Sequence, residues 1–334
     1  MEITKIEKKV PLFINKYQPL YFDDFGIDQE LINILKTFIL MDNLNIMLIG
    51  EIASGKTSLL NTIVREYYRG YNQKEYENNI LYINSLKEQG IHYYRTDVKT
   101  FCQTCSTIKN KKKIIVLDDI DLINEQSQQV FRNCIDKFSK NVHFISSCCN
   151  TQKVIESIQS RFNIIKIKPL KRENLTSLLN KIKQGENIHI EPDAEDFIIN
   201  VSNNTIKILI NYMEKFKLLD EKTITLHLAQ QLCTNISFLT FEEFTKFVKS
   251  NDLTNANKLI YEIYDKGYSV MDILDNYFTF IKTTNLLTED EKYNIIPIIC
   301  KYITIFNNIH EDEIELALFT NNIINVIHNE TNIK

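Results

Sequence analysis

The sequence is poor in features that mark several specialised classes of protein. It has no tryptophan and only seven glycines among 334 residues. No apolar run approaches the roughly 18 to 20 residues that span a bilayer, and the first residues begin no signal-peptide pattern. We therefore expect an intracellular protein with no membrane partner. The abundance of Asn, Ile and Lys is typical of AT-rich coding DNA.

An excess of basic charge is also missing. The formal net charge is −4, and the isoelectric point is near 6.0. These values exclude a globally basic surface for binding nucleic acid, although a local basic stripe remains open. The hydrophobic content of 44% is that of an ordinary globular protein. The length predicts two or three domains.

The seven cysteines lack a regular arrangement, which favours reduced thiols in a reducing compartment. Cys102 and Cys105 are the one pair with metal-ligand spacing. A zinc site would need a second pair, or histidines at ligand spacing. Neither is visible in the sequence, so we expect structural thiols.

The most informative stretch is residues 44–60. An apolar run at 46–49 precedes Gly50, and Gly55-Lys56-Thr57 follows four residues later, before a helical pattern. This is the P-loop pattern G-x-x-x-x-G-K-[ST] between a strand and a helix, which binds nucleotide phosphates. We expect Lys56 to reach the β- and γ-phosphates of ATP and Thr57 to hold Mg²⁺. The residues expected to surround the phosphates are Gly50, Glu51, Ile52, Ala53, Ser54, Gly55, Lys56, Thr57 and Ser58.

A second apolar run, at 114–117, ends in Asp118-Asp119-Ile120-Asp121. Carboxylates at the C-terminal end of a buried strand, in the same sheet as a P-loop strand, are placed to hold Mg²⁺ and to orient a water molecule. We therefore expect Asp118 to be a metal ligand and Asp119 to act on the attacking water. The alternative is a solvated pair of acids that ends a strand.

The order of elements predicts the architecture. Apolar runs at 46–49, 80–83, 114–117, 142–149 and 164–167 alternate with helical patterns, which predicts a parallel sheet with helices on both faces. Residues 69–78 read as a loop, and a helix is expected to carry Val154, Ile155 and Ile158. Beyond residue 169 only helical patterns occur: first a three-helix unit, then a further helical segment from about residue 235.

At this point the motifs resemble, in order and over essentially the whole chain, a small subunit of replication factor C. This AAA+ clamp loader occurs in archaea, eukaryotes and some large DNA viruses. An origin in such a virus or in another AT-rich genome would agree with the composition. The residues that carry the resemblance, besides the P-loop and the strand-end acids, are Lys16-Tyr17-Gln18-Pro19, Asn84, Gly90-Ile91, Arg95, Lys99, Phe101, Gln128, Arg132, Ser139, Asn150, Gln159-Ser160-Arg161, Gly267-Tyr268-Ser269 and Asp272-Ile273.

The resemblance implies an α/β P-loop AAA+ domain at 1–168, an all-α lid at 169–232 and an all-α collar for oligomerisation at 233–334. It implies that Asn150 aligns the attacking water and that Arg161 acts as an arginine finger on a neighbouring subunit's nucleotide. Tyr17 and Lys207 are expected to assist nucleotide binding. Arg95, Lys99 and Arg132 are expected to contact the DNA backbone. Arg95 and Lys99, four residues apart, share one helix face.

Two departures from the family bear on catalysis. Asp119 stands where the family has a catalytic glutamate, and a carboxylate pulled back by one methylene aligns water less well. Ile206 stands where the lid helix has a phosphate-sensing arginine, so that Lys207 would have to substitute. The replacements at Gln18 and Phe162 leave the nucleotide site intact.

The implied function is a subunit of a pentameric, ATP-dependent clamp loader. It would open a PCNA-like sliding clamp and load it onto primer-template DNA, in the nucleus or at a viral replication site in the cytoplasm. The alternatives are an ATP-binding scaffold subunit with little turnover and another AAA+ DNA motor. A small-molecule P-loop kinase is disfavoured, because it would need neither Arg161 nor the helical tail.

Overall fold

The computed structural model describes residues 11–26, 28–85, 90–168, 170–202, 205–219, 223–234, 236–306 and 310–331. The chain forms two compact units: residues 1–179 with 204–211, and residues 180–203 with 212–334. Within the described ranges, no helix combines the length and hydrophobicity that crossing a membrane requires.

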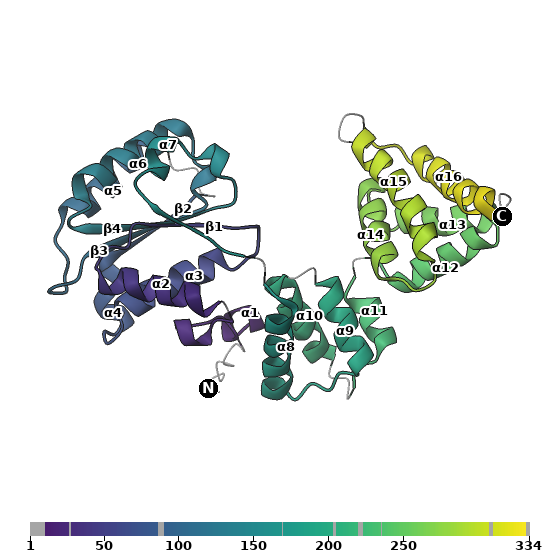
Figure 1. Ribbon diagram of the computed structural model, residues 1–334, viewed down its shortest axis with the longest axis horizontal. Helices are drawn as coiled ribbons and strands as arrows, with labels where there is room; N and C mark the ends of the chain where they lie inside the picture. Colours follow the sequence, from purple (N-terminus) through teal and green to yellow (C-terminus); the bar gives the residue numbers. More distant parts are fainter. Residues whose placement is uncertain are drawn as a thin grey trace, which may run out of the picture. The chain divides into compact units, whose positions relative to one another are not determined.

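A five-stranded, fully parallel sheet is the centre of the first unit (Figure 1). Its order is β2-β3-β4-β1-β5, so the P-loop strand β1 has β4 on one side and β5 on the other. The strands are β1 (Ile46–Ile49), β2 (Ile80–Asn84), β3 (Lys113–Asp118), β4 (Val142–Cys148) and β5 (Asn163–Lys166). Because all five run in one direction, their C-terminal ends meet at one edge, where ligands bind in such sheets.

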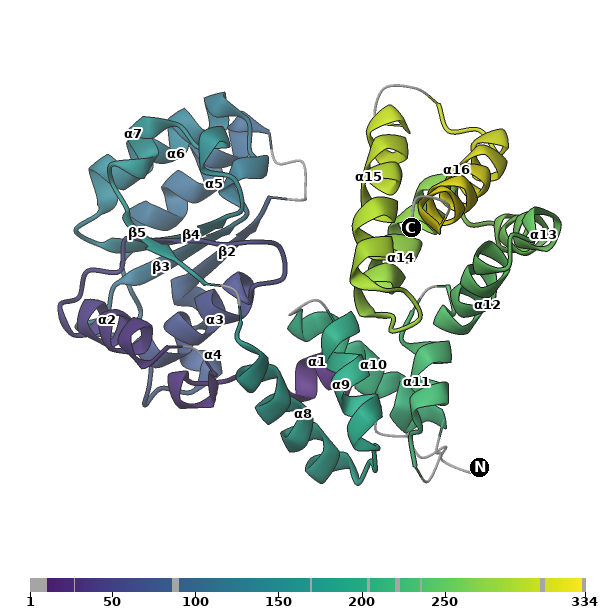
Figure 2. The same ribbon diagram turned by 45° about the vertical axis from the view of Figure 1, so that its right-hand side comes forward.

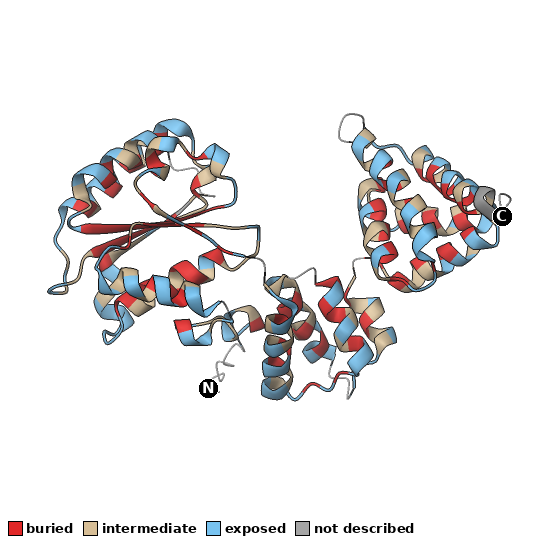
Figure 3. Cartoon of the chain, viewed as in Figure 1, coloured by how far each residue is buried: buried red, intermediate tan, exposed pale blue. Residues whose placement is uncertain are grey.

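Helices cover both faces of the sheet (Figures 1 and 2). Strand side chains point alternately to the two faces: Ile114 and Val116 enter one hydrophobic cluster, and Ile115 and Leu117 enter the other. The three central strands, β1, β3 and β4, are therefore mainly apolar and buried, as Figure 3 shows. The first face carries α2 (Gln29–Leu40), α3 (Lys56–Tyr67) and α4 (Gln73–Tyr76), and the second carries α5 (Ile91–Gln103), α6 (Glu125–Phe138) and α7 (Glu156–Gln159); α1 (Phe13–Lys16) precedes them.

Two local predictions were wrong. The expected loop at 69–78 contains α4, because Asn72 and Glu75 form a reciprocal capping box in which the Asn72 N–H donates to Glu75 Oε2 over 2.9 Å. The helix expected to include Val154 and Ile155 begins only at Glu156. Side chains hydrogen-bond to backbone groups of these two residues: the Ile155 N–H donates to Gln128 Oε1, and Gln159 Nε2 donates to the Val154 carbonyl.

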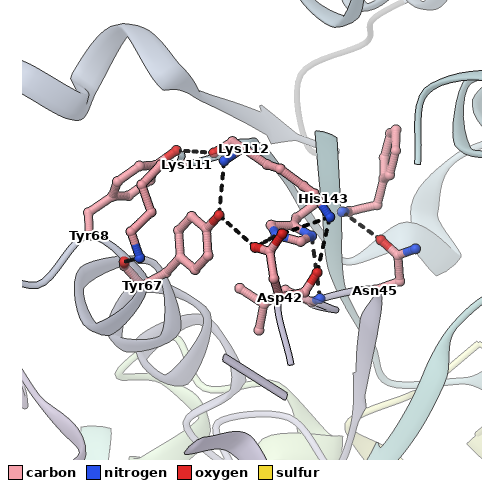
Figure 4. Close-up of polar contacts among 9 residues, drawn as sticks. Asp42, Asn45, Tyr67, Tyr68, Lys111, Lys112 and His143 are labelled. Atoms are coloured by element: carbon pink, nitrogen blue, oxygen red, sulfur yellow. Dashed lines mark hydrogen bonds and ion pairs between the residues drawn. The ribbon is translucent and has the colours of Figure 1, made fainter. Parts of the chain in front are cut away.

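A polar cluster closes the opposite, N-terminal edge of the sheet (Figure 4). Asp42 Oδ1 accepts a hydrogen bond from the Tyr67 hydroxyl and lies 2.9 Å from His143 Nε2. The Leu44 N–H donates to His143 Nδ1, so Nε2 carries the hydrogen of the neutral ring and donates it to Asp42. Burial lowers the pKa of His143 to about 4. Lys112 pairs with the second oxygen of Asp42 over 2.9 Å.

Beyond β5 the chain is mostly helical. The predicted three-helix unit contains a fourth helix, α11, which the sequence analysis missed. The helices are α8 (Arg172–Glu186), α9 (Pro192–Val201), α10 (Ile206–Leu219), α11 (Leu226–Leu232), α12 (Phe238–Lys249), α13 (Leu253–Tyr264), α14 (Val270–Thr283), α15 (Glu289–Phe306) and α16 (Ile314–Thr331). Both α8 and α10 contribute residues to each compact unit, and the three-domain division stays a prediction.

An aromatic cluster fills the core of the second unit. Tyr277 of α14 is fully buried, and its ring lies 5.3 Å from the rings of Phe241 and Phe244, centroid to centroid, and 6.0 Å from that of Phe319. Its hydroxyl lies 3.4 Å from Thr245 Oγ1, which gives the buried phenol a polar partner. These contacts join α12, α14 and α16 around one residue.

Candidate nucleotide-binding site

The loop 50–58 leaves the end of β1 and enters α3 through a tight turn. A Cβ atom at Gly50 would lie 2.8 Å from Ser54 Oγ and 3.3 Å from the Ile167 carbonyl oxygen, so a side chain there would be crowded. Gly55 has φ +88°, in the left-handed region that glycine adopts without strain. The backbone conformation therefore favours glycine at position 55, and close packing favours it at position 50.

The interior of the loop is suited to an anion. Lys56 is 6% exposed, and its Nζ donates to the carbonyls of Gly50 (3.0 Å) and Glu51 (2.7 Å). Helix α3 begins at Lys56 without a side-chain cap, which leaves the amides of its first turn open to a ligand. Ser54 Oγ is buried and has no hydrogen-bond partner among the described residues. A phosphate group would give these donors an acceptor.

The P-loop hydroxyl and the first strand-end acid meet at this edge of the sheet. Thr57 Oγ1 donates to Asp118 Oδ2 over 2.8 Å. The other oxygen of Asp118 accepts from Ser147 of β4, and its carbonyl accepts from Ser85. A hydroxyl beside a carboxylate provides the hard oxygen donors that Mg²⁺ prefers, so these residues fit that ion.

Ser147 is a site residue that the sequence analysis missed. It is fully buried at the end of β4 and both donates to Asp118 and accepts from the Asp119 N–H over 2.9 Å. The available signal was a pair of serines, Ser146 and Ser147, near the end of a mainly apolar strand. A polar residue that interrupts a buried strand next to an acidic strand end is a candidate partner for that acid.

Asp119 has a left-handed backbone, with φ 54°. Asp and Asn tolerate this region better than longer residues, because their short side chains bond locally. Burial and the neighbouring charges of Asp118 and Asp121 raise the pKa of Asp119, while Lys56 opposes the rise. A carboxylate with a raised pKa is a better general base than an ordinary aspartate.

Asp121 organises the neighbouring strand end. Its Oδ2 accepts the N–H groups of Cys149 (3.2 Å) and Asn150 (3.0 Å). The Asn150 Oδ1 accepts the Gln152 N–H over 2.9 Å and caps a short 3₁₀ helix at Thr151–Lys153. Asn150 therefore follows β4 at the correct edge of the sheet, but its side-chain oxygen is already bonded. Its action on water stays a prediction.

Arg161 follows α7 and is bonded within its own chain. Both Nε and Nη2 donate to the carboxylate of Asp136 on α6. Nη1 donates to the Ser157 carbonyl and to Ser160 Oγ. These described partners lie on α6 and α7 and not on the loop 50–58, and the action of Arg161 on a neighbouring subunit stays a prediction.

The cations expected to contact DNA lie on adjacent helices. Arg95 and Lys99 are exposed on α5, beside the buried face formed by Tyr94 and Val98. Arg132 lies on α6, which packs beside α5 on the same face of the sheet (Figure 1). The structure thus brings these elements together, and DNA contact stays a prediction.

The two remaining nucleotide-site candidates are less clearly defined. Tyr17 ends α1 and packs its ring edge-on against Phe13, with centroids 5.6 Å apart. Lys207 is exposed in the first turn of α10, beside the half-buried Ile206. The lid motif in which this chain departs from the family begins at Asn203 and Asn204, and both lie outside the described residues.

Comparison with known proteins places these features in a family. The ATPase family associated with various cellular activities (AAA) matches residues 46–170, and the replication factor C C-terminal domain matches residues 239–304. A replication factor C small subunit of Acanthamoeba polyphaga mimivirus is 27% identical over 86% of this chain and 88% of its own length. The small subunit of Methanococcus vannielii is 28% identical over 86% and 90%.

A human relative and a solved structure extend the comparison. Human replication factor C subunit 5 is 25% identical over 83% of this chain and 81% of its own length. The solved structure of Thermotoga maritima RuvB superposes with a TM-score of 0.53 at 15% identity, over 82% of this chain and 93% of RuvB. At that identity the likeness to RuvB shows the fold alone. With the P-loop geometry and the two family matches, the comparisons show that this chain belongs to the replication factor C small-subunit family of AAA+ ATPases.

Proposed function

We propose that this clamp-loader subunit binds MgATP at residues 50–58 and couples its hydrolysis to opening a PCNA-like sliding clamp and loading it onto primer-template DNA. The observation that carries the proposal is the 2.8 Å hydrogen bond between Thr57 and Asp118. It joins the phosphate-binding loop to the strand-end acid, and a phosphoryl-transfer site needs both. The assembly we propose is a pentamer joined through a collar at 233–334, with a lid at 169–232.

Each residue of the site has a stated task in this proposal. Lys56 and the first amides of α3 hold the phosphates. Thr57 and Asp118 would hold Mg²⁺, and the bound ion would neutralise negative charge on the phosphates. Asp119 takes the proton from the attacking water, with Asn150 orienting that water. Tyr17 and Lys207 assist nucleotide binding.

The site is completed by a neighbouring subunit. Arg161 of this chain acts on the nucleotide of the next subunit, where its positive charge stabilises the transferring phosphoryl group, typically a 10³- to 10⁵-fold effect on the rate. On the same reasoning, a neighbour supplies the finger to the loop 50–58. Arg95, Lys99 and Arg132 contact DNA phosphates, so binding is independent of base sequence and weakens with salt.

We also propose that the turnover of this subunit's own site is slow. Asp119 replaces the longer glutamate, and Ile206 replaces the lid arginine. A misplacement of about 1 Å can cost on the order of a hundredfold in rate. We expect the replacements at Asp119 and Ile206 to affect ATP binding less than they affect hydrolysis. Another AAA+ DNA motor is not favoured, because residues 239–304 match the replication factor C C-terminal domain.

The test compares Lys56→Ala with Lys74→Ala, an exposed lysine of α4. Titration calorimetry with MgATP should show binding lost in Lys56→Ala and retained in the control. In the loader assembled from all its subunits, loading of the sliding clamp onto primer-template DNA should depend on ATP and fall in Lys56→Ala. Loading at the wild-type rate by Lys56→Ala would contradict the proposal.

A further inference from the structure

Arg161 is part of a three-residue charge cluster, with Asp136 and Arg132, to which the proposed function assigns no common role. Asp136 accepts two hydrogen bonds from the guanidinium of Arg161, and the Nη2 to Oδ2 distance is 3.1 Å. The same Oδ2 lies 3.6 Å from Nε of Arg132, one turn earlier on α6. One carboxylate thus lies between two arginines, and Arg161 takes the two-point contact.

The contact fixes the direction of the guanidinium. An arginine has five N–H donors in one plane, and a carboxylate that accepts from Nε and Nη2 sets the orientation of that plane. Nη1 is also bonded, to the Ser157 carbonyl and Ser160 Oγ. Without Asp136, an arginine side chain that is 30% exposed would sample several rotamers.

Asp136 is itself held rigidly. Helix α6 is fourteen residues long and is anchored in the core by Phe131, Cys134 and Ile135. Its N-terminus is capped by Asn124, whose Oδ1 accepts the Ser127 N–H over 2.8 Å. Groups that act on a transition state are most effective when neighbours on rigid elements hold them in place. The short α7, which precedes Arg161, would not do this alone.

We propose that Asp136 is a positioning residue for Arg161: it holds the guanidinium in the orientation in which the arginine acts on a neighbouring subunit's nucleotide. This inference rests on the proposed role of Arg161 and adds the residue that keeps the finger ready. The ion pair also affects the titration of Asp136, because the bonded Arg161 holds the pKa of that carboxyl below its usual range. Asp136 does not contact the reacting atoms.

The first measurement examines the pair in the full chain. Phenylglyoxal modifies accessible arginines, and peptide mass spectrometry reports the rate at each position. Arg161 should react several-fold faster in Asp136→Asn than in the wild type. Glu125→Gln removes an exposed acid from the first turn of the same helix and should leave the rate unchanged. Equal rates in all three proteins would overturn the proposal.

The second measurement examines catalysis in the assembled loader with MgATP. Asp136→Asn should lower kcat by about 10- to 100-fold and leave KM unchanged, because the finger acts in the transition state. Asp136→Glu, which keeps the charge, should restore part of the rate. In an Arg161→Ala background, Asp136→Asn should have no further effect, since the two residues act as one unit.

The outcomes separate the two proposals. If Arg161→Ala leaves turnover unchanged, the finger assignment fails, and this inference fails with it. If Arg161→Ala lowers turnover but Asp136→Asn does not, only the positioning role is wrong. A higher turnover in Asp136→Asn would also contradict the positioning role, because Asp136 would then keep Arg161 from reaching the neighbouring nucleotide. ATP binding by the chain's own loop should be equal in all variants, which controls for folding.

Discussion

Asp119→Glu is expected to increase the turnover of this subunit's own site. The variant extends the carboxylate by one carbon–carbon bond, about 1.5 Å. Since a misplacement of that size can cost on the order of a hundredfold, restoring the reach should raise the single-turnover rate by up to about 100-fold, or roughly 2.7 kcal/mol of barrier. The gain has a structural cost, because Asp119 has φ 54°. Glutamate is less well suited to that backbone, and we expect a loss of up to ~1 kcal/mol in the free energy of unfolding.

The assay is rapid-quench hydrolysis of MgATP by the assembled loader, in which the neighbouring sites carry P-loop lysine substitutions. Asp119→Asn is the matched control, since it keeps the shape and removes the base; its rate should fall below that of the wild type. ATP affinity, measured by calorimetry, should be equal in all three proteins. If Asp119→Asn hydrolyses ATP as fast as the wild type, Asp119 is not the base. If Asp119→Glu gives no gain, the shorter side chain does not limit the rate.

Asp119 also predicts a dependence on pH. Burial and the charges of Asp118 and Asp121 raise the pKa of Asp119. As the solution is acidified, Asp119 is therefore protonated, and lost as a base, at a higher pH than an ordinary aspartate. A raised folded-state pKa means that the folded protein binds this proton more tightly than the unfolded chain does. Ionised Asp119 therefore lowers stability at neutral pH. Asp119→Asn should raise the free energy of unfolding at pH 7, and the difference should vanish at a pH below the unfolded-state pKa. An equal difference at both pH values would contradict this.

Three further predictions follow from other parts of the structure. The folded-state pKa of His143 is about 4, below its unfolded value, so the free energy of unfolding should fall by about 3 kcal/mol as the pH drops from 6.5 to 4. Urea unfolding of the wild type and of His143→Gln at both pH values measures this loss. An equal pH dependence in the two proteins would refute the prediction. Tyr277→Ala should destabilise the second unit by ~3 to 5 kcal/mol, measured in the same way, and a loss below ~1 kcal/mol would be inconsistent with its packing. Arg95→Ala and Lys99→Ala should each reduce the salt dependence of DNA binding by about one released ion, and an unchanged slope in fluorescence titrations would place DNA elsewhere.

The sequence predicted the sheet and the phosphate-binding loop because both depend on local patterns. Strands buried on both faces are mainly apolar, and the phosphate-binding loop has a recognisable glycine pattern. The partners of the acids could not be predicted in this way. Ser147 reaches Asp118 across 29 positions of sequence, and Asp136 reaches Arg161 across 25. Such contacts depend on strand order and helix packing, which one sequence does not specify.

The short elements show the same limit. Side chains distant in sequence, such as Gln128 at Ile155, replaced the backbone bonds that would have begun a helix earlier. Asp119 is a different case. The sequence revealed its departure from the family, and the structure adds a local reason, because its left-handed backbone suits aspartate.

In the proposed loader, the chemistry of this site is shared between subunits. The most direct test is Arg161→Ala in this chain, with two readouts on the same preparation. We expect ATP binding at this chain's own loop to be unchanged and ATP turnover by the neighbouring subunit in the assembled loader to fall on the order of 10³-fold. Weaker ATP binding at the chain's own loop, with unchanged ATP turnover by the neighbouring subunit, would show that Arg161 serves its own site.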